Sequence, residues 1–105
     1  MASKRIHLIE RDGRIEKIDG GIWESGYWIV SSASAKQLVG GSIFHHKKQA
    51  EPSFFGGIIL GYRIQEEGPF AGRVIFKFQY AHDHRGVSAG KGGWGNEMKM
   101  VLPYK

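Results

Sequence analysis

The chain has 105 residues, a net charge of +5 and no cysteine, which excludes disulfide cross-links and thiolate metal sites. This length and the 41% hydrophobic content predict one domain, residues 1–105, with a single hydrophobic core. The excess of lysine and arginine favours a polyanionic partner, and nucleic acid is the most common polyanion in cells.

The N-terminal segment carries only a short, mostly apolar run at residues 6–9. A signal peptide needs an apolar stretch of about 7–15 residues, and a membrane-spanning helix needs about 20. We therefore expect a cytoplasmic protein that does not contact a membrane.

The first half of the chain predicts strands. Alternating apolar residues indicate strands at residues 5–9 and 14–18, and the Asp12-Gly13 pair between them predicts a β-hairpin. Residues 26–31 are apolar on both faces, which is typical of a strand in the middle of a sheet.

One helix and four further strands follow. Residues 32–39 predict a helix of about two turns, with a serine to cap its start and a glycine pair to end it. Strands are expected at residues 42–46, 57–65, 73–80 and 97–102, where apolar residues alternate with polar ones. In the second of these strands, alternation places four apolar residues on one face: Ile58, Leu60, Tyr62 and Ile64.

These elements predict a β-dominated α+β fold with one short helix. The 16 glycines favour bulges and bends, so the strands are expected to form a small, strongly curved sheet or a partly closed barrel.

The most function-like segment is residues 82–95, called here the 82–95 loop. Long loops in compact domains are uncommon and are often functional. Glycines in this loop free backbone amides, Arg85 and Lys91 can contact phosphate, and Trp94 can stack on a base. The alternative is a flexible surface hairpin anchored only by Trp94.

A second cluster and two further tryptophans complete the predicted ligand site. Lys47 and Lys48 lie beside aromatic residues and are expected to contact a phosphate backbone. Trp28 lies in a strand that is apolar on both faces, which favours a place in the core. Trp23 is flanked by glycines and is freer to line a pocket.

Three histidines support a catalytic alternative. His45, His82 and His84 could act as general acid and base on a phosphodiester, with a nearby cation to stabilise the developing charge. His82 and His84 match no established metal-binding spacing. We therefore expect no metal and no cofactor.

The order of segments resembles the PUA-like barrels, in particular the EVE and ASCH groups. The similarity covers residues 26–80 and is carried by Gly-Tyr-Trp-Ile-Val at 26–30, the helix through Leu38-Val39, and the strands at 41–44 and 57–62. It implies binding of RNA or a modified base in an aromatic pocket, with some relatives acting as ribonucleases. The pocket residues it implies are Trp23, Trp28, His45 and Trp94.

Three functions therefore remain open at this point. The first is a non-enzymatic domain that binds RNA or DNA, with a modified base as a possible ligand. The second is a small metal-independent ribonuclease that uses the histidines. The third is a protein-interaction module whose loop becomes ordered when a partner binds.

Overall fold

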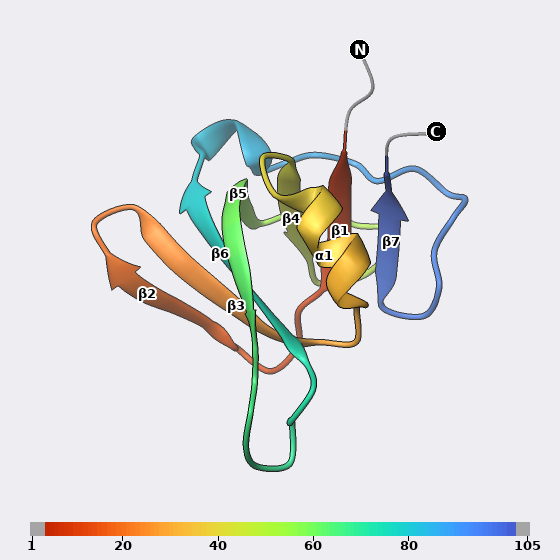
Figure 1. Cartoon of the computed structure of the whole chain (residues 1–105). Helices are drawn as coiled ribbons and strands as arrows, with labels where there is room; N and C mark the ends of the chain where they lie inside the picture. The colour runs from red at the N-terminus through yellow and green to blue at the C-terminus, as the bar shows by residue number, and fades with distance from the viewer. Residues whose placement is uncertain (1–3, 103–105) are drawn as a thin grey trace.

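The computed structural model describes residues 4–102. Its strands form one mixed, seven-stranded sheet in the order β2-β3-β6-β5-β4-β1-β7 (Figure 1). The strands are β1 (Arg5–Ile9), β2 (Ile15–Asp19), β3 (Ile22–Trp28), β4 (Ser42–His46), β5 (Phe55–Ile64), β6 (Val74–Tyr80) and β7 (Met98–Val101), accompanied by the helix α1 (Ser32–Leu38) and the 3-10 helix η1 (His82–His84).

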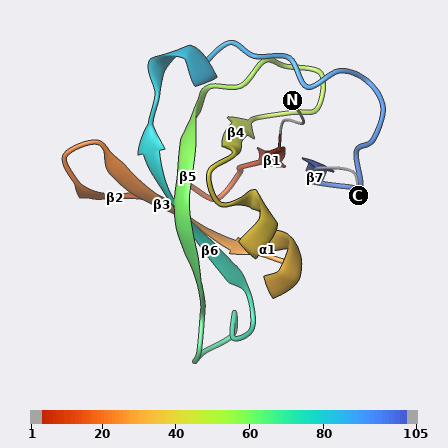
Figure 2. The same cartoon turned by 45° about the horizontal axis from the view of Figure 1, so that its top comes forward.

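The sheet is open and strongly twisted. Its edge strands β2 and β7 do not pair with each other, so the strands do not close into a barrel. Figure 2 shows β5 and β6 lengthwise while β1, β4 and β7 are seen nearly end-on, because the strands rotate progressively across the sheet. The predicted β-dominated α+β fold with one short helix is confirmed, in its curved-sheet form.

The predicted hairpin between residues 5–9 and 14–18 is wrong. β1 pairs in parallel with β4 and antiparallel with β7, whereas β2 pairs with β3. The Asp12-Gly13 pair instead forms a corner that separates the two strands, and Gly13 adopts a φ of 69° there. The apolar side chains of β1 are buried, and this burial favours its position between β4 and β7 over a marginal two-stranded hairpin.

The helix α1 forms where the serine-rich segment predicts it. The Ser31 side chain accepts a hydrogen bond from the Ser34 backbone N–H at 3.1 Å and caps the helix. The helix ends before Gly40, which has a φ of 89° and donates its N–H to the Ile59 carbonyl. Nowhere in residues 4–102 does a helix have the length and apolar character needed to cross a bilayer.

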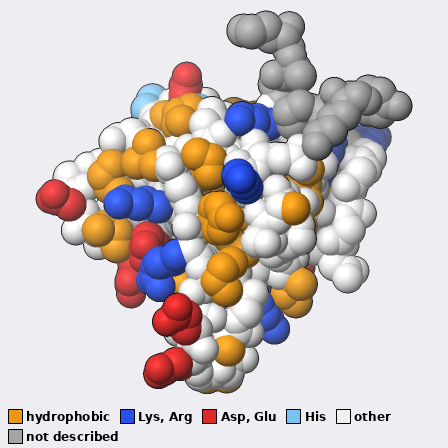
Figure 3. Space-filling view, viewed as in Figure 1, with side chains coloured by type: hydrophobic (Ala, Val, Ile, Leu, Met, Phe, Trp, Pro, Cys, Tyr) orange, Lys and Arg blue, Asp and Glu red, His pale blue; other side chains and the backbone are white. Residues whose placement is uncertain are grey.

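The core lies between the concave face of the sheet and α1. Phe76 and Phe78 of β6 are fully buried and belong to the same hydrophobic cluster as the core side chains of β1 and α1. β5 contributes Ile59 to this core, while Ile58 and Leu60 are 38% and 46% exposed. Figure 3 shows hydrophobic side chains along the middle of one face of the molecule, interspersed with lysine and arginine.

We expect Gly57→Ala to lower the free energy of unfolding by about 3 kcal/mol, because overpacked sites rarely relax fully. A Cβ at Gly57 would lie 1.8 Å from the backbone oxygen of Gln79 on β6, and backbone cannot move aside as a side chain can. Urea unfolding measures the loss.

Gly61→Ala on the same strand is the matched control. A Cβ at Gly61 meets nothing within 4 Å, so the substitution should change the free energy of unfolding by no more than about 0.5 kcal/mol. Equal losses of unfolding free energy in the two variants would show that the close approach of β6 to Gly57 does not explain the cost of adding a side chain there.

Candidate functional site

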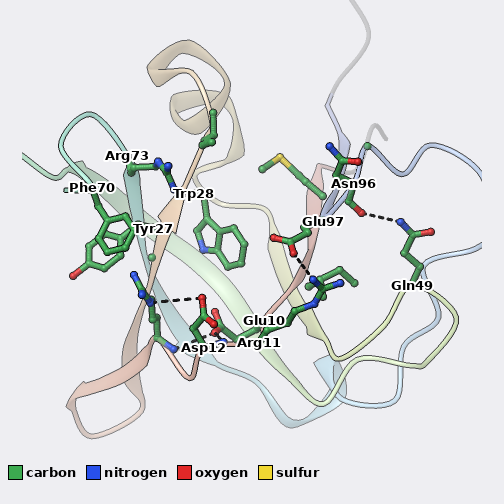
Figure 4. A pocket seen from close by; sticks show the side chains of 16 residues that line it. Glu10, Arg11, Asp12, Tyr27, Trp28, Gln49, Phe70, Arg73, Asn96 and Glu97 are labelled. Carbon is green, nitrogen blue, oxygen red and sulfur yellow. Dashed lines mark hydrogen bonds and ion pairs between the residues drawn. The ribbon is translucent and has the colours of Figure 1, made fainter.

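An open cleft of about 1050 Å³ lies where the ends of β1 and β3 meet the β5–β6 turn and the segment before β7. Figure 4 shows the Trp28 indole near its middle, with an aromatic group on one side and acidic and amide groups on the other. The polar, charged and aromatic residues that line it include Glu10, Arg11, Arg14, Tyr27, Trp28, Gln49, Phe70, Arg73, Asn96 and Glu97.

The aromatic wall of the cleft carries two guanidinium groups. The rings of Tyr27 and Phe70 stack with centroids 4.6 Å apart and planes 5° apart. The guanidinium carbon of Arg14 lies 4.3 Å from the Phe70 ring centroid, and that of Arg73 lies 5.5 Å from it. These cation–π contacts keep positive charge beside half-buried aromatic rings.

Trp28 is held rigidly at the cleft. Its Nε1–H donates to the Ser25 hydroxyl at 2.9 Å, and the residue is 8% exposed. The indole is therefore a fixed apolar surface whose polar edge is already bonded. Trp28 is both a core residue and a lining residue of the cleft.

The opposite wall is built from ion pairs and amides. Arg11 and Glu97 form an ion pair with an N–O distance of 2.8 Å. The Gln49 side-chain amide donates to the Asn96 carbonyl at 2.8 Å, which ties the β4–β5 connection to the segment before β7. This wall supplies both donors and acceptors to the cleft.

Behind the cleft, the 82–95 loop covers the outer face of β1 and β4 and buries a histidine pair. His7 Nδ1 lies 2.9 Å from His46 Nε2, and His46 Nδ1 lies 2.8 Å from the Glu51 carbonyl. Since a carbonyl only accepts, His46 Nδ1 donates there and its Nε2 accepts from His7. Trp94 contacts both rings edge-on.

His84 anchors η1 to this face. Its ring stacks on Phe44 with centroids 4.8 Å apart, its Nε2 lies 2.9 Å from Ser42 Oγ, and its Nδ1 lies 2.7 Å from Asp83 Oδ1. The three polar groups follow the order of a hydrolytic triad. The Ser42 backbone N–H, however, donates to the Lys4 carbonyl, so this donor is not free to stabilise an oxyanion. We assign these bonds to loop attachment.

The three histidines predicted to be catalytic do not converge. His45 is fully buried on the core face, where its Nε2 lies 2.8 Å from Ser25 Oγ. His84 lies on the opposite face of the sheet, and His82 is exposed, 3.4 Å from the Tyr80 hydroxyl. A fully buried imidazole cannot share a substrate with side chains on the other face.

The predicted ligand-binding residues are also dispersed, and Trp28 alone among them lines the cleft. Trp23 is half-buried and contacts Phe55 edge-on at 4.9 Å, and Trp94 lies on the histidine pair. The predicted cationic residues are exposed: Lys47, Lys48, Arg85 and Lys91. Lys47 and Lys48 directly precede Gln49 but do not line the cleft, and Lys47 Nζ lies 5.9 Å from the Phe54 ring centroid. Arg85 and Lys91 belong to the loop.

Sequence reasoning missed the cleft because its walls come from five separate segments. The signal that could have indicated it is arginine next to aromatic residues at strand ends, as at Phe70 and Arg73. Within residues 4–102, no group of three or more histidine, aspartate and glutamate side chains is arranged to hold a metal ion.

No protein-family model matches the chain, and comparisons with the curated proteins and with the solved structures gave no match.

Burial keeps the inner histidines neutral. Desolvation lowers the pKa of His45 to about 3, with a smaller opposing effect from the Phe55 backbone. Desolvation also lowers the pKa of His7 to about 4, with smaller electrostatic effects of His46, Arg5 and Lys99 in the same direction. The pKa of His46 is lowered by the same burial.

We expect the free energy of unfolding to fall as the pH decreases from 6.5 to 4, by on the order of 3 kcal/mol. The folded-state pKa values of His7 and His45 lie below the ordinary histidine value of about 6.5, so in this range the unfolded chain binds more protons. Urea unfolding at several pH values measures the slope. His7→Phe should make the slope shallower, and an identical slope in this variant would exclude His7 as a contributor.

Proposed function

We propose that this protein binds single-stranded nucleic acid and seats one base in the cleft. The observation that carries this proposal is the combination of aromatic rings, guanidinium groups and hydrogen-bonding side chains around one open volume. Each of these groups matches a different part of a nucleotide.

The aromatic surfaces match the base. Tyr27 and Phe70 form a stacked pair at one wall, and the fixed, mostly buried Trp28 indole also lines the cleft. Stacking of a base on an aromatic side chain is worth about 1–3 kcal/mol and tolerates any base, because every base has a flat π-face.

The cations match the phosphates. Arg14 and Arg73 lie on the aromatic wall, where phosphates flanking a stacked base can reach them. Lys47 and Lys48 are exposed and directly precede the cleft residue Gln49 in the chain. The net charge of +5 favours the same partner through long-range attraction.

An unpaired base suits the cleft better than a duplex. Bases in a duplex are stacked on their neighbours and paired along their edges, so a side chain reaches their faces only after unstacking. The cleft offers both a stacking surface and groups for the base edge, which is the combination that a single strand or a flipped base requires.

Arg73→Ala should weaken binding of a fluorescently labelled single-stranded oligonucleotide by about 5- to 30-fold, because it removes a phosphate contact and a cation beside the stacking surface. In a plot of the logarithm of affinity against the logarithm of salt concentration, the variant should also have a slope that is shallower by about one. Fluorescence anisotropy across a salt titration, with RNA and DNA of the same sequence, measures both quantities.

Lys17→Ala is the control for this experiment. Lys17 is exposed on β2 outside the cleft, so its removal takes away the same charge but should leave the affinity nearly unchanged. Equal effects of Arg73→Ala and Lys17→Ala would show diffuse electrostatic binding without a site. Loss of binding in an Arg85→Ala/Lys91→Ala double variant alone would move the site to the 82–95 loop.

A further inference from the structure

Glu10 is a buried carboxylate at the edge of the cleft. It directly follows β1, lines the cleft and is 8% exposed. Its backbone N–H donates to the His46 carbonyl at 2.9 Å, so its position is fixed by the sheet. A carboxylate so enclosed is costly unless its oxygens receive hydrogen bonds.

One of its oxygens is satisfied by the backbone. Glu10 Oε1 accepts hydrogen bonds from the Asp12 N–H at 3.0 Å and the Arg14 N–H at 3.1 Å. These two bonds shape the corner between β1 and β2 and lock the orientation of the carboxylate.

The other oxygen is unused. Among residues 4–102, no group forms a hydrogen bond or ion pair with Glu10 Oε2. The neighbouring arginines have other partners, because Arg11 pairs with Glu97 at 2.8 Å and Arg14 lies 3.9 Å from Asp12. Glu10 Oε2 is not one of the fully buried unpaired atoms, so it is accessible in the cleft that Glu10 and Trp28 both line.

We propose that Glu10 Oε2 accepts a hydrogen bond from the exocyclic amino group of the bound base, so that the cleft prefers amino-bearing bases to uracil and thymine. This inference rests on the proposed function of the same cleft. It adds a specificity determinant to the sequence-tolerant stacking described above.

The chemistry of the base edges supports this preference. Cytosine presents its N4 amino group as a donor, and adenine and guanine also carry amino groups. Uracil presents a carbonyl oxygen at the position of the cytosine amino group, and its N3–H donor lies between two carbonyls. A carboxylate that faces this edge of uracil is close to the lone pairs of the carbonyl oxygens. A carboxylate oxygen left without a donor costs free energy.

Cytosine and uracil form the sharpest test, because they differ in the groups at this edge while their rings are nearly the same size. We expect the protein to bind short oligo(C) at least about fivefold more tightly than oligo(U) at neutral pH, as one good base contact discriminates by about 1–3 kcal/mol. Fluorescence anisotropy with the full chain and labelled oligonucleotides measures the ratio of the two affinities.

Glu10→Gln should reduce or reverse this ratio. The amide oxygen can keep the two backbone bonds, which places the amide NH₂ where Oε2 was and offers a donor to the uracil carbonyl. Circular dichroism checks that the variant is folded. Glu16→Gln removes the same charge from an exposed position on β2 outside the cleft and should leave the ratio unchanged.

The outcomes separate the two proposals. Absence of binding to either oligonucleotide overturns the proposed function itself. Equal binding of oligo(C) and oligo(U) by the wild-type chain leaves that function standing and overturns the role of Glu10, even if Glu10→Gln does not fold. A cytosine preference that survives in folded Glu10→Gln also overturns it.

Discussion

The fold depends on the position of β1 between β4 and β7. A strand that pairs on both sides and is covered on both faces satisfies its backbone groups and buries its apolar residues at once. Ile6 and Leu8 lie on the core face, while His7 lies on the outer face under the 82–95 loop. This strand positions the corner at Glu10 and, through its pairing with β7, the adjacent wall of the cleft.

The cleft exists because the chain turns sharply where β1 ends. β2 belongs to the opposite edge of the sheet, so the chain must leave the β1–β4 pair directly after Ile9. Glu10 stabilises this turn through two backbone N–H groups. The same carboxylate that builds the corner thus faces the space that the corner opens.

Local signals in the sequence predicted most of the elements to within a few residues, but they did not predict which strands pair. The strand expected at residues 26–31 was wrong in its bounds, because β3 spans Ile22–Trp28 and Ile29 is 74% exposed. The serine cap of α1 and the bounds of β4 depend on only a few neighbouring residues. The structure confirms both predictions. The Asp12-Gly13 turn was also recognised, but a turn signal does not say which strands pair. That choice is made by the burial of β1 against β4, which lies more than thirty residues away.

For the candidate site, the sequence again showed the residue types but not their arrangement. The histidines were predicted to be catalytic, but their chemistry depends on exposure, which composition does not encode. His7 and His46 bond to each other, and His45 bonds to Ser25 in the core. The fold therefore uses these imidazoles as neutral, hydrogen-bonded packing groups. Glu10 shows the opposite: a single glutamate at a strand end has no sequence signature, so composition did not single it out. Its unpaired oxygen nevertheless supplies a hydrogen-bond acceptor to the cleft.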